Sequence, residues 1–108
     1  MKNFLVSLLL ASLSTSSYSA YFDDQLELAK QGDAKAQFSL GIMYADGESV
    51  QHDSKTAAMW YTKAAEQGLA NAQYNLGLMY NNGNGVPEND KTAVMWYATV
   101  IRRPLCNG

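Results

Sequence analysis

Apolar side chains recur at helical spacing along most of this chain. Between residues 34 and 46 they fall at i, i+4, i+7 and i+8, which predicts an amphipathic helix of about three turns with one apolar face: Ala36, Leu40, Met43 and Tyr44. A second apolar face at helical spacing follows residue 53: Ala57, Trp60, Tyr61, Ala64 and Ala65. Two helices joined by a short loop predict a helical hairpin.

The hairpin pattern occurs a second time, 36 residues later. Segments 32–61 and 68–97 align without a gap, and 16 of the 30 aligned positions are identical. Self-similarity at a fixed period of this size is typical of stacked repeats, in which each hairpin buries apolar surface against its neighbour. The sequence therefore predicts an all-α fold, an α-α superhelix of two stacked helical hairpins.

The predicted helix boundaries carry residues suited to them. Gly32 fits the left-handed position that ends a helix. Good N-cap residues precede three of the helices: Asp33, Asp53 and Asn89. The segments 47–52 and 83–88 are predicted loops. Each contains a single apolar residue that we expect to plug between helices, Val50 and Val86.

A glycine stands inside the first helix of each copy, at Gly41 and Gly77. Glycine costs a helix about 1 kcal/mol relative to alanine, so its recurrence indicates a place where a neighbouring helix approaches closely. We expect large residues of one hairpin to pack against small residues of the next. Each large side chain buried in this way should stabilise the fold by about 1.5–3 kcal/mol. The large set is Met43, Tyr44, Met59, Trp60 and Tyr61, and the small set is Ala70, Ala72 and Gly77.

A short helix is predicted ahead of the repeats, in residues 21–31. It has two aspartates at its start and apolar residues at roughly helical spacing: Phe22, Leu26, Leu28 and Ala29. Residues 29–32 align with residues 65–68 under the 36-residue shift. This helix therefore resembles the end of a repeat's second helix, and we expect it to act as an N-terminal capping helix.

Residues 1–20 have the pattern of a secretory signal peptide. Lys2 is followed by an apolar stretch at 4–13, about 10 residues long and too short to span a bilayer of about 30 Å, and then by a small, polar run. Cleavage after Ser19 and after Ala20 both fit. The alternatives are a buried helix or an uncleaved anchor, but the mixed serines and leucines show no helical stripe. We expect an exported protein, periplasmic or secreted, without stable membrane insertion after cleavage.

Charge and cysteine content narrow the partner classes. Without Lys2 the chain has seven basic and ten acidic residues, a net charge of 7 − 10 = −3, which argues against a nucleic-acid or anionic-membrane partner. Cys106 is the only cysteine, so no internal disulfide can form and stability must come from apolar packing. Its thiol can pair with another chain, although an incidental tail residue is the simpler interpretation.

The second copy departs from the first near its end. Ala64 and Ala65 are replaced by Val100 and Ile101, and Pro104 blocks continuation of the helix. We place the repeat domain at 21–103, with repeats at about 32–67 and 68–103 and a tail at 104–108. No third repeat follows to cover Trp96 and its face. Three interpretations stay open: a short protein that self-associates through its uncapped C-terminal hairpin, a marginally stable monomer, or a truncated relic of a longer protein.

These residues resemble the Sel-one-like repeat (SLR), a variant of the tetratricopeptide repeat, over about residues 22–100. The matching motifs are Ala34-Lys-Ala-Gln37, Leu40-Gly-Ile-Met-Tyr44 and Trp60-Tyr-Thr-Lys-Ala-Ala65, with Ala70-Asn-Ala-Gln73, Leu76-Gly-Leu-Met-Tyr80 and Trp96-Tyr97 in the second copy. The resemblance implies a TPR-like solenoid that acts as an adaptor binding a protein or peptide. One cysteine-rich branch is linked to β-lactam binding and hydrolysis, which is the alternative function; its paired cysteines are absent here.

No catalytic, cofactor or metal site is predicted. His52 is the only histidine and lies in a loop beside Asp53, without a His/Cys cluster or a nucleophile–base arrangement. Four methionines recur in register with the apolar face, so we interpret them as core residues rather than soft-metal ligands: Met43, Met59, Met79 and Met95.

A peptide groove is the preferred site hypothesis. In stacked hairpins the first helices line the concave side, and the face that the core leaves free carries polar residues suited to an extended backbone. The predicted partner-binding residues are Lys35, Ser39, Asn71, Asn75 and Asn82. A plain solvent-exposed polar face is the alternative.

Overall fold

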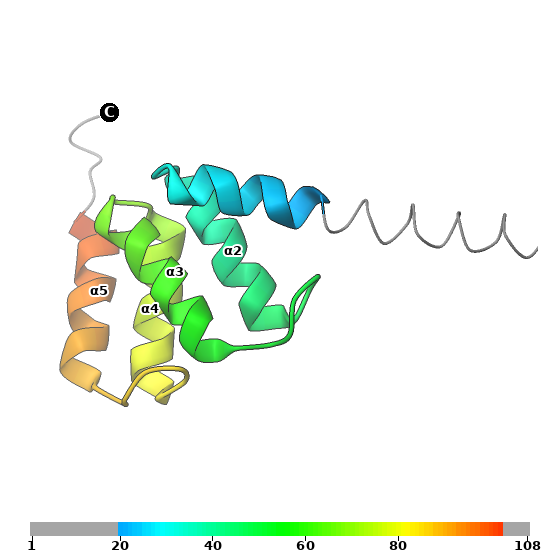
Figure 1. Cartoon of the computed structure of the whole chain (residues 1–108). Coiled ribbons are helices and arrows are strands. Elements are labelled where there is room, and N and C mark those ends of the chain that lie inside the picture. The colour runs from blue at the N-terminus through cyan, green and yellow to red at the C-terminus, as the bar shows by residue number, and fades with distance from the viewer. Residues whose placement is uncertain (1–19, 103–108) are drawn as a thin grey trace, which may run out of the picture.

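Four helices of 13 residues each follow one another as two hairpins. The computed structural model describes residues 20–102. Helices α2 (Ala34–Asp46) and α3 (Ser54–Glu66) form the first hairpin, and α4 (Ala70–Asn82) and α5 (Asp90–Arg102) form the second. A further helical segment at residues 20–30 lies across the end of α2 (Figure 1). The described residues contain no strand, so the predicted all-α fold is confirmed.

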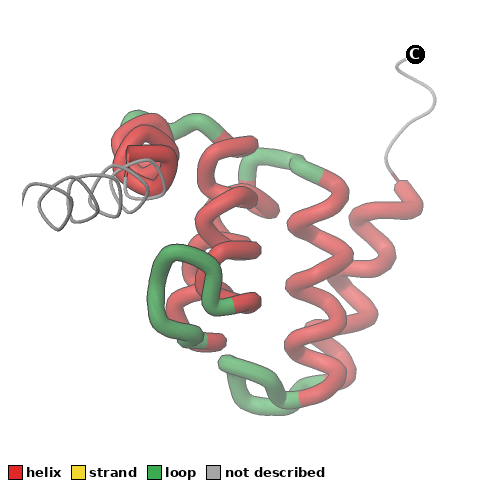
Figure 2. Tube along the Cα trace, turned by 90° about the vertical axis from the view of Figure 1, so that its right-hand side faces the viewer, coloured by secondary structure: helices red, strands yellow, loops and turns green. Residues whose placement is uncertain are grey.

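Each helix packs on the next in chain order, α2 on α3, α3 on α4 and α4 on α5. Figure 2 shows the hairpin helices running side by side, with the N-terminal segment seen end-on because it crosses them. This is the stacked arrangement that the 36-residue repeat predicts. Residues 1–19 of the predicted signal peptide, as well as Pro104 and Cys106, lie outside the described residues.

The predicted helix boundaries are confirmed by hydrogen bonds. Asp33 accepts from the Ala36 amide at 3.0 Å, and Asn89 accepts from the Thr92 amide at 3.1 Å. Asp53 accepts from the amides of Lys55 and Thr56, and its other oxygen accepts from the Thr56 hydroxyl at 2.8 Å. Gly32 has a φ of +102°, as expected for the left-handed end of a helix.

The N-terminal segment caps the first hairpin. Ala29 is 2% exposed and shares a core cluster with Trp60, and Phe22 and Leu26 pack at its edge. The buried Gln37 side chain donates to the Ala29 carbonyl at 3.0 Å, just as Gln73 donates to the Ala65 carbonyl at 3.0 Å one repeat later. The segment therefore occupies the place of a preceding repeat's second helix, as predicted, although Leu28 points outward and is 42% exposed.

The core differs from the predicted large-against-small packing between hairpins. Tyr61 does share a core cluster with Ala72, Leu76 and Met79 of the next hairpin. Trp60 instead packs backward, in a cluster with Ala29, Ala36, Leu40 and Met43. The two loop valines pack as predicted, Val50 against the Trp60 cluster and Val86 against the Tyr61 cluster.

Two of the four methionines were wrongly assigned to the core. Met43 and Met79 are buried, but Met59 is 46% exposed and Met95 is 55% exposed. The reason is geometric: each lies one position before a tryptophan that packs toward the interior, Trp60 being buried and Trp96 partly buried, so its own side chain points away from the packed face of the helix. Trp96 was also misplaced, because it packs against the interior cluster around Tyr61 and does not belong to the open end.

The helical glycines allow close approach within a hairpin rather than between hairpins. A Cβ added to Gly41 would lie 2.5 Å from two ring carbons of Tyr61 on α3, and one added to Gly77 would lie 2.6 Å from the Tyr97 ring on α5. The expectation that Gly77 receives a residue of the preceding hairpin is therefore wrong. In both copies the missing side chain makes room for the tyrosine of the same hairpin.

Substitution of these glycines by alanine should destabilise the two hairpins unequally. Gly41→Ala should lower the free energy of unfolding by about 1–3 kcal/mol, because Tyr61 is enclosed and the overpacking exceeds the gain of about 1 kcal/mol in helix propensity. Gly77→Ala should cost less, because Tyr97 is only partly buried and can shift. Urea unfolding followed by circular dichroism measures both. Equal losses for the two variants would contradict the enclosed placement of Tyr61.

Candidate functional site

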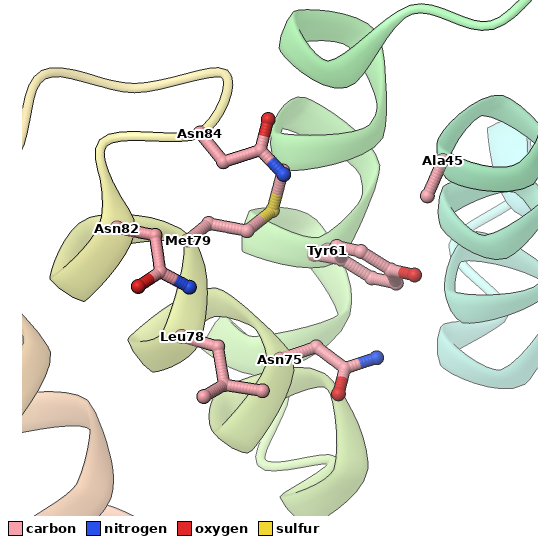
Figure 3. Close-up of a pocket in the computed structure, with 7 residues that line it drawn as sticks. All are labelled: Ala45, Tyr61, Asn75, Leu78, Met79, Asn82 and Asn84. Atoms are coloured by element: carbon pink, nitrogen blue, oxygen red, sulfur yellow. The ribbon is translucent and has the colours of Figure 1, made fainter.

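A groove of about 240 Å³ opens on the side of the first helices. Its lining comes from both hairpins: Ala45 from α2, Tyr61 from α3, the α4 side chains Asn75, Leu78, Met79 and Asn82, and Asn84 from the following loop. Figure 3 shows Tyr61 and Asn75 reaching toward Ala45 across the space between α4 and α2. The groove exists only because the two hairpins stack.

The wall of the groove combines amides with apolar surface. Asn82 and Asn84 are exposed, Asn75 is partly buried, and each amide offers both donors and an acceptor. Leu78 and the Tyr61 ring supply the apolar part. No lysine, arginine, aspartate or glutamate lines it. This surface suits an uncharged, hydrogen-bonding ligand.

The Tyr61 hydroxyl is the titratable group of the groove. Burial raises the pKa of Tyr61 above its ordinary value of 10.0, and the negative charge of Asp46 acts in the same direction. A hydrogen bond from the Asn75 side chain opposes these effects. The phenol is therefore neutral at physiological pH and is held beside the Asn75 amide as a hydrogen-bonding group.

Two of the five predicted partner-binding residues line the groove, Asn75 and Asn82. Lys35 and Asn71 are exposed and Ser39 is partly buried, but none of the three belongs to the lining. Lys35 and Asn71 lie in the first turns of α2 and α4, whereas the groove lies along the middle and C-terminal parts of these helices.

Sequence reasoning missed Tyr61 and Asn84 as groove residues. Tyr61 was assigned to the core on its helical spacing, and its ring is indeed buried, but its polar end reaches the groove. Asn84 was interpreted only as part of a turn. A usable signal existed, since Ala45, Asp46 and Glu48 of the first copy are all replaced by asparagine in the second.

The described residues show little that suits a reactive centre. His52 is exposed, and its Nε2 lies 3.3 Å from the Ser54 hydroxyl. Among the described residues this pair is not part of a larger hydrogen-bond network. Within residues 20–102, no three His, Cys, Asp or Glu side chains gather as a metal site would require. Nor does this part of the chain contain a helix that is both long and apolar enough to cross a membrane.

The Sel1 repeat family model matches the chain twice, over residues 34–69 and 70–99. The chain belongs to the Sel1 repeat family. Repeats of this family are generally protein–protein interaction modules, and Sel1 repeat proteins are typically non-enzymatic scaffolds. No curated protein matches the chain.

Solved structures of Sel1 repeat proteins are similar to this chain. One is c5321, a protective antigen present in uropathogenic Escherichia coli strains, with 41% identity, a TM-score of 0.72 and coverage of 74% of this chain and 17% of that one. A Sel1 repeat protein from Oxalobacter formigenes has 33% identity and a TM-score of 0.65, over 83% of this chain and 40% of that one. Helicobacter pylori cysteine rich protein B has 26% identity and a TM-score of 0.75, over 78% of this chain and 63% of that one. This Sel1 repeat chain thus spans between 17% and 63% of the length of these proteins.

The raised pKa of Tyr61 predicts a specific loss of stability in alkali. A neutral buried phenol contributes stability that is fully present below pH 10.0, the ordinary value, and that is lost as the pH rises through the higher pKa of the folded state. As the pH rises above 10.0, the melting temperature of the wild-type protein should therefore fall more steeply than that of Tyr61→Phe. Thermal unfolding at a series of pH values measures the difference, and parallel curves for the two proteins would contradict a buried Tyr61 hydroxyl.

Proposed function

We propose that this Sel1 repeat protein binds an extended peptide segment of a partner protein in the groove between α2 and α4. The observation that carries the proposal is the convergence of three asparagines with an apolar floor in one groove: Asn75, Asn82 and Asn84 beside Tyr61 and Leu78. Asparagine amides can pair with the N–H and C=O groups of a peptide backbone, while the apolar floor accommodates alternate side chains.

The charges around the groove favour a neutral or basic segment. The lining is uncharged, and the charge that acts on Tyr61 is the carboxylate of Asp46 at the end of α2. An acidic peptide would meet this negative charge without a compensating cation in the wall. The protein as a whole is also acidic, with a net charge of −2. We therefore expect selected ligands to contain few aspartates and glutamates.

The binding proposal can be tested with a random peptide library displayed on phage. Peptides selected on the wild-type protein should bind the double variant Asn75→Ala/Asn82→Ala on the order of tenfold more weakly or worse, because each lost hydrogen bond is worth about 1 kcal/mol. Isothermal titration calorimetry measures the affinities.

The matched control is Asn71→Ala, which changes an exposed asparagine on the same helix outside the groove. It should leave the affinity unchanged. Selection of no peptide above background would contradict the proposal, and so would equal binding by the control and the double variant.

We also propose that the protein acts outside the cytoplasm. The support is the sequence pattern of residues 1–20, a lysine followed by a short apolar stretch and small residues. Mass spectrometry of the protein recovered from its native host should find an N-terminus at Ala20 or Tyr21. Recovery of a chain that still carries Met1 to Ser19 would contradict export by signal cleavage.

A further inference from the structure

Helix α5 presents an apolar stripe to solvent, formed by Val94, Tyr97, Ala98 and Ile101. Val94 is 63% exposed and Ile101 is 80% exposed, with Tyr97 and Ala98 partly buried between them. A hollow of about 310 Å³ lies beside this stripe and is lined by Tyr74, Tyr97, Val100 and Ile101. The α5 stripe shares no residue with the peptide groove.

The equivalent stripe of the first hairpin is mostly buried, with only Thr62 partly exposed. Under the 36-residue shift it consists of Ala58, Tyr61, Thr62 and Ala65. Ala58 and Ala65 are 3% and 1% exposed and share a core cluster with Ala72 and Leu76 of α4. The aromatic neighbours match as well: the Phe38 and Tyr61 rings lie 5.6 Å apart at 43°, and the Tyr74 and Tyr97 rings lie 5.8 Å apart at 44°. Within residues 20–102, the second hairpin thus forms the same face without a helix that covers it.

The residues of this face are more apolar than the equivalent residues of the first hairpin. Ala58 corresponds to Val94, Thr62 to Ala98, and Ala65 to Ile101. A terminal repeat that faces water normally has a polar outer surface, so this composition indicates a covered face. The branched side chains also prevent a further helix from seating as closely as α4 seats on alanines. The face therefore fits a helix that packs differently from a third repeat.

We propose that a second copy of this chain covers the face, with the two α5 helices antiparallel across a two-fold axis. Ala98 is small enough to let the helices meet near the axis, where Val94 of one copy opposes Ile101 of the other. Asp90 lies in the first turn of α5 and Arg102 in its last turn. The antiparallel arrangement places each aspartate near the arginine of the second copy, at both ends of the interface, and a two-fold contact of this kind closes as a dimer.

Sedimentation equilibrium of the purified chain, as the cell processes it, tests the proposal. A Cys106→Ser background prevents an intermolecular disulfide from accounting for the mass. The wild-type surface should give a dimer that dissociates on dilution. Val94→Glu/Ile101→Glu should weaken dimerisation by about a hundredfold or more, because four apolar side chains of the interface become like charges.

Both substitutions lie at exposed positions, so circular dichroism should show the helical fold retained. The matched control is Met59→Glu, which changes an equally apolar, 46% exposed residue on α3 and should leave the dimer unchanged. A monomer at every concentration would overturn the proposal. A dimer unaffected by Val94→Glu/Ile101→Glu would also overturn it, as would masses that grow beyond the dimer, which indicate head-to-tail stacking.

A charge exchange tests the antiparallel arrangement. Asp90→Arg and Arg102→Asp should each weaken the dimer, since each places like charges together at both ends of the interface. The variant that carries both substitutions should recover much of the lost dimer affinity, because each pair then forms with its charges exchanged. Failure of the combined variant to recover while the single variants stay helical would overturn the antiparallel arrangement.

Discussion

The contact between Tyr61 and Gly41 is the interaction on which the rest of this structure depends. The ring lies so close to the backbone of α2 that a Cβ at position 41 would overlap it, and residues of α4 pack against it as well. One side chain therefore joins three helices, and its hydroxyl end reaches the groove. Because the same residue fixes the hairpin, the stacking and the groove wall, binding in the proposed peptide groove would be coupled to the packing of the helices.

Much of the fold can be predicted from the sequence because the repeat shows most structural positions twice. Helix ends, N-caps and the capping role of the N-terminal segment are set by local chemistry, such as the carboxylate of Asp33 and the left-handed Gly32, and local chemistry can be recognised in sequence. What helical spacing does not give is the direction in which a buried face points. Trp60 was therefore assigned to the wrong neighbours, Trp96 to an uncovered face, and Met59 to the wrong side of its helix.

The groove was harder to predict than the fold for a similar reason. Asn75 and Asn82 lie on the free face of a predicted helix, so periodicity alone finds them. Periodicity also selects Lys35 and Asn71, because it carries no information on where along a helix the neighbouring hairpin leaves a gap. Tyr61 was missed for the opposite reason. Its ring is buried while its hydroxyl reaches the groove, and helical spacing assigns a residue either to the core or to the surface but not to both.

The buried glutamines have a consequence for the order in which the protein opens. In the first repeat both polar atoms of the Gln37 side chain are hydrogen-bonded, the nitrogen donating to the Ala29 carbonyl and the oxygen accepting from Gln67 at 2.9 Å. In the second, Gln73 donates to Ala65, but its side-chain oxygen has no hydrogen-bond partner among residues 20–102. In a linear array of repeats local unfolding begins where neighbour contacts are weakest. In the monomer we therefore expect faster amide exchange in the α4–α5 hairpin than in the α2–α3 hairpin, which the N-terminal segment caps.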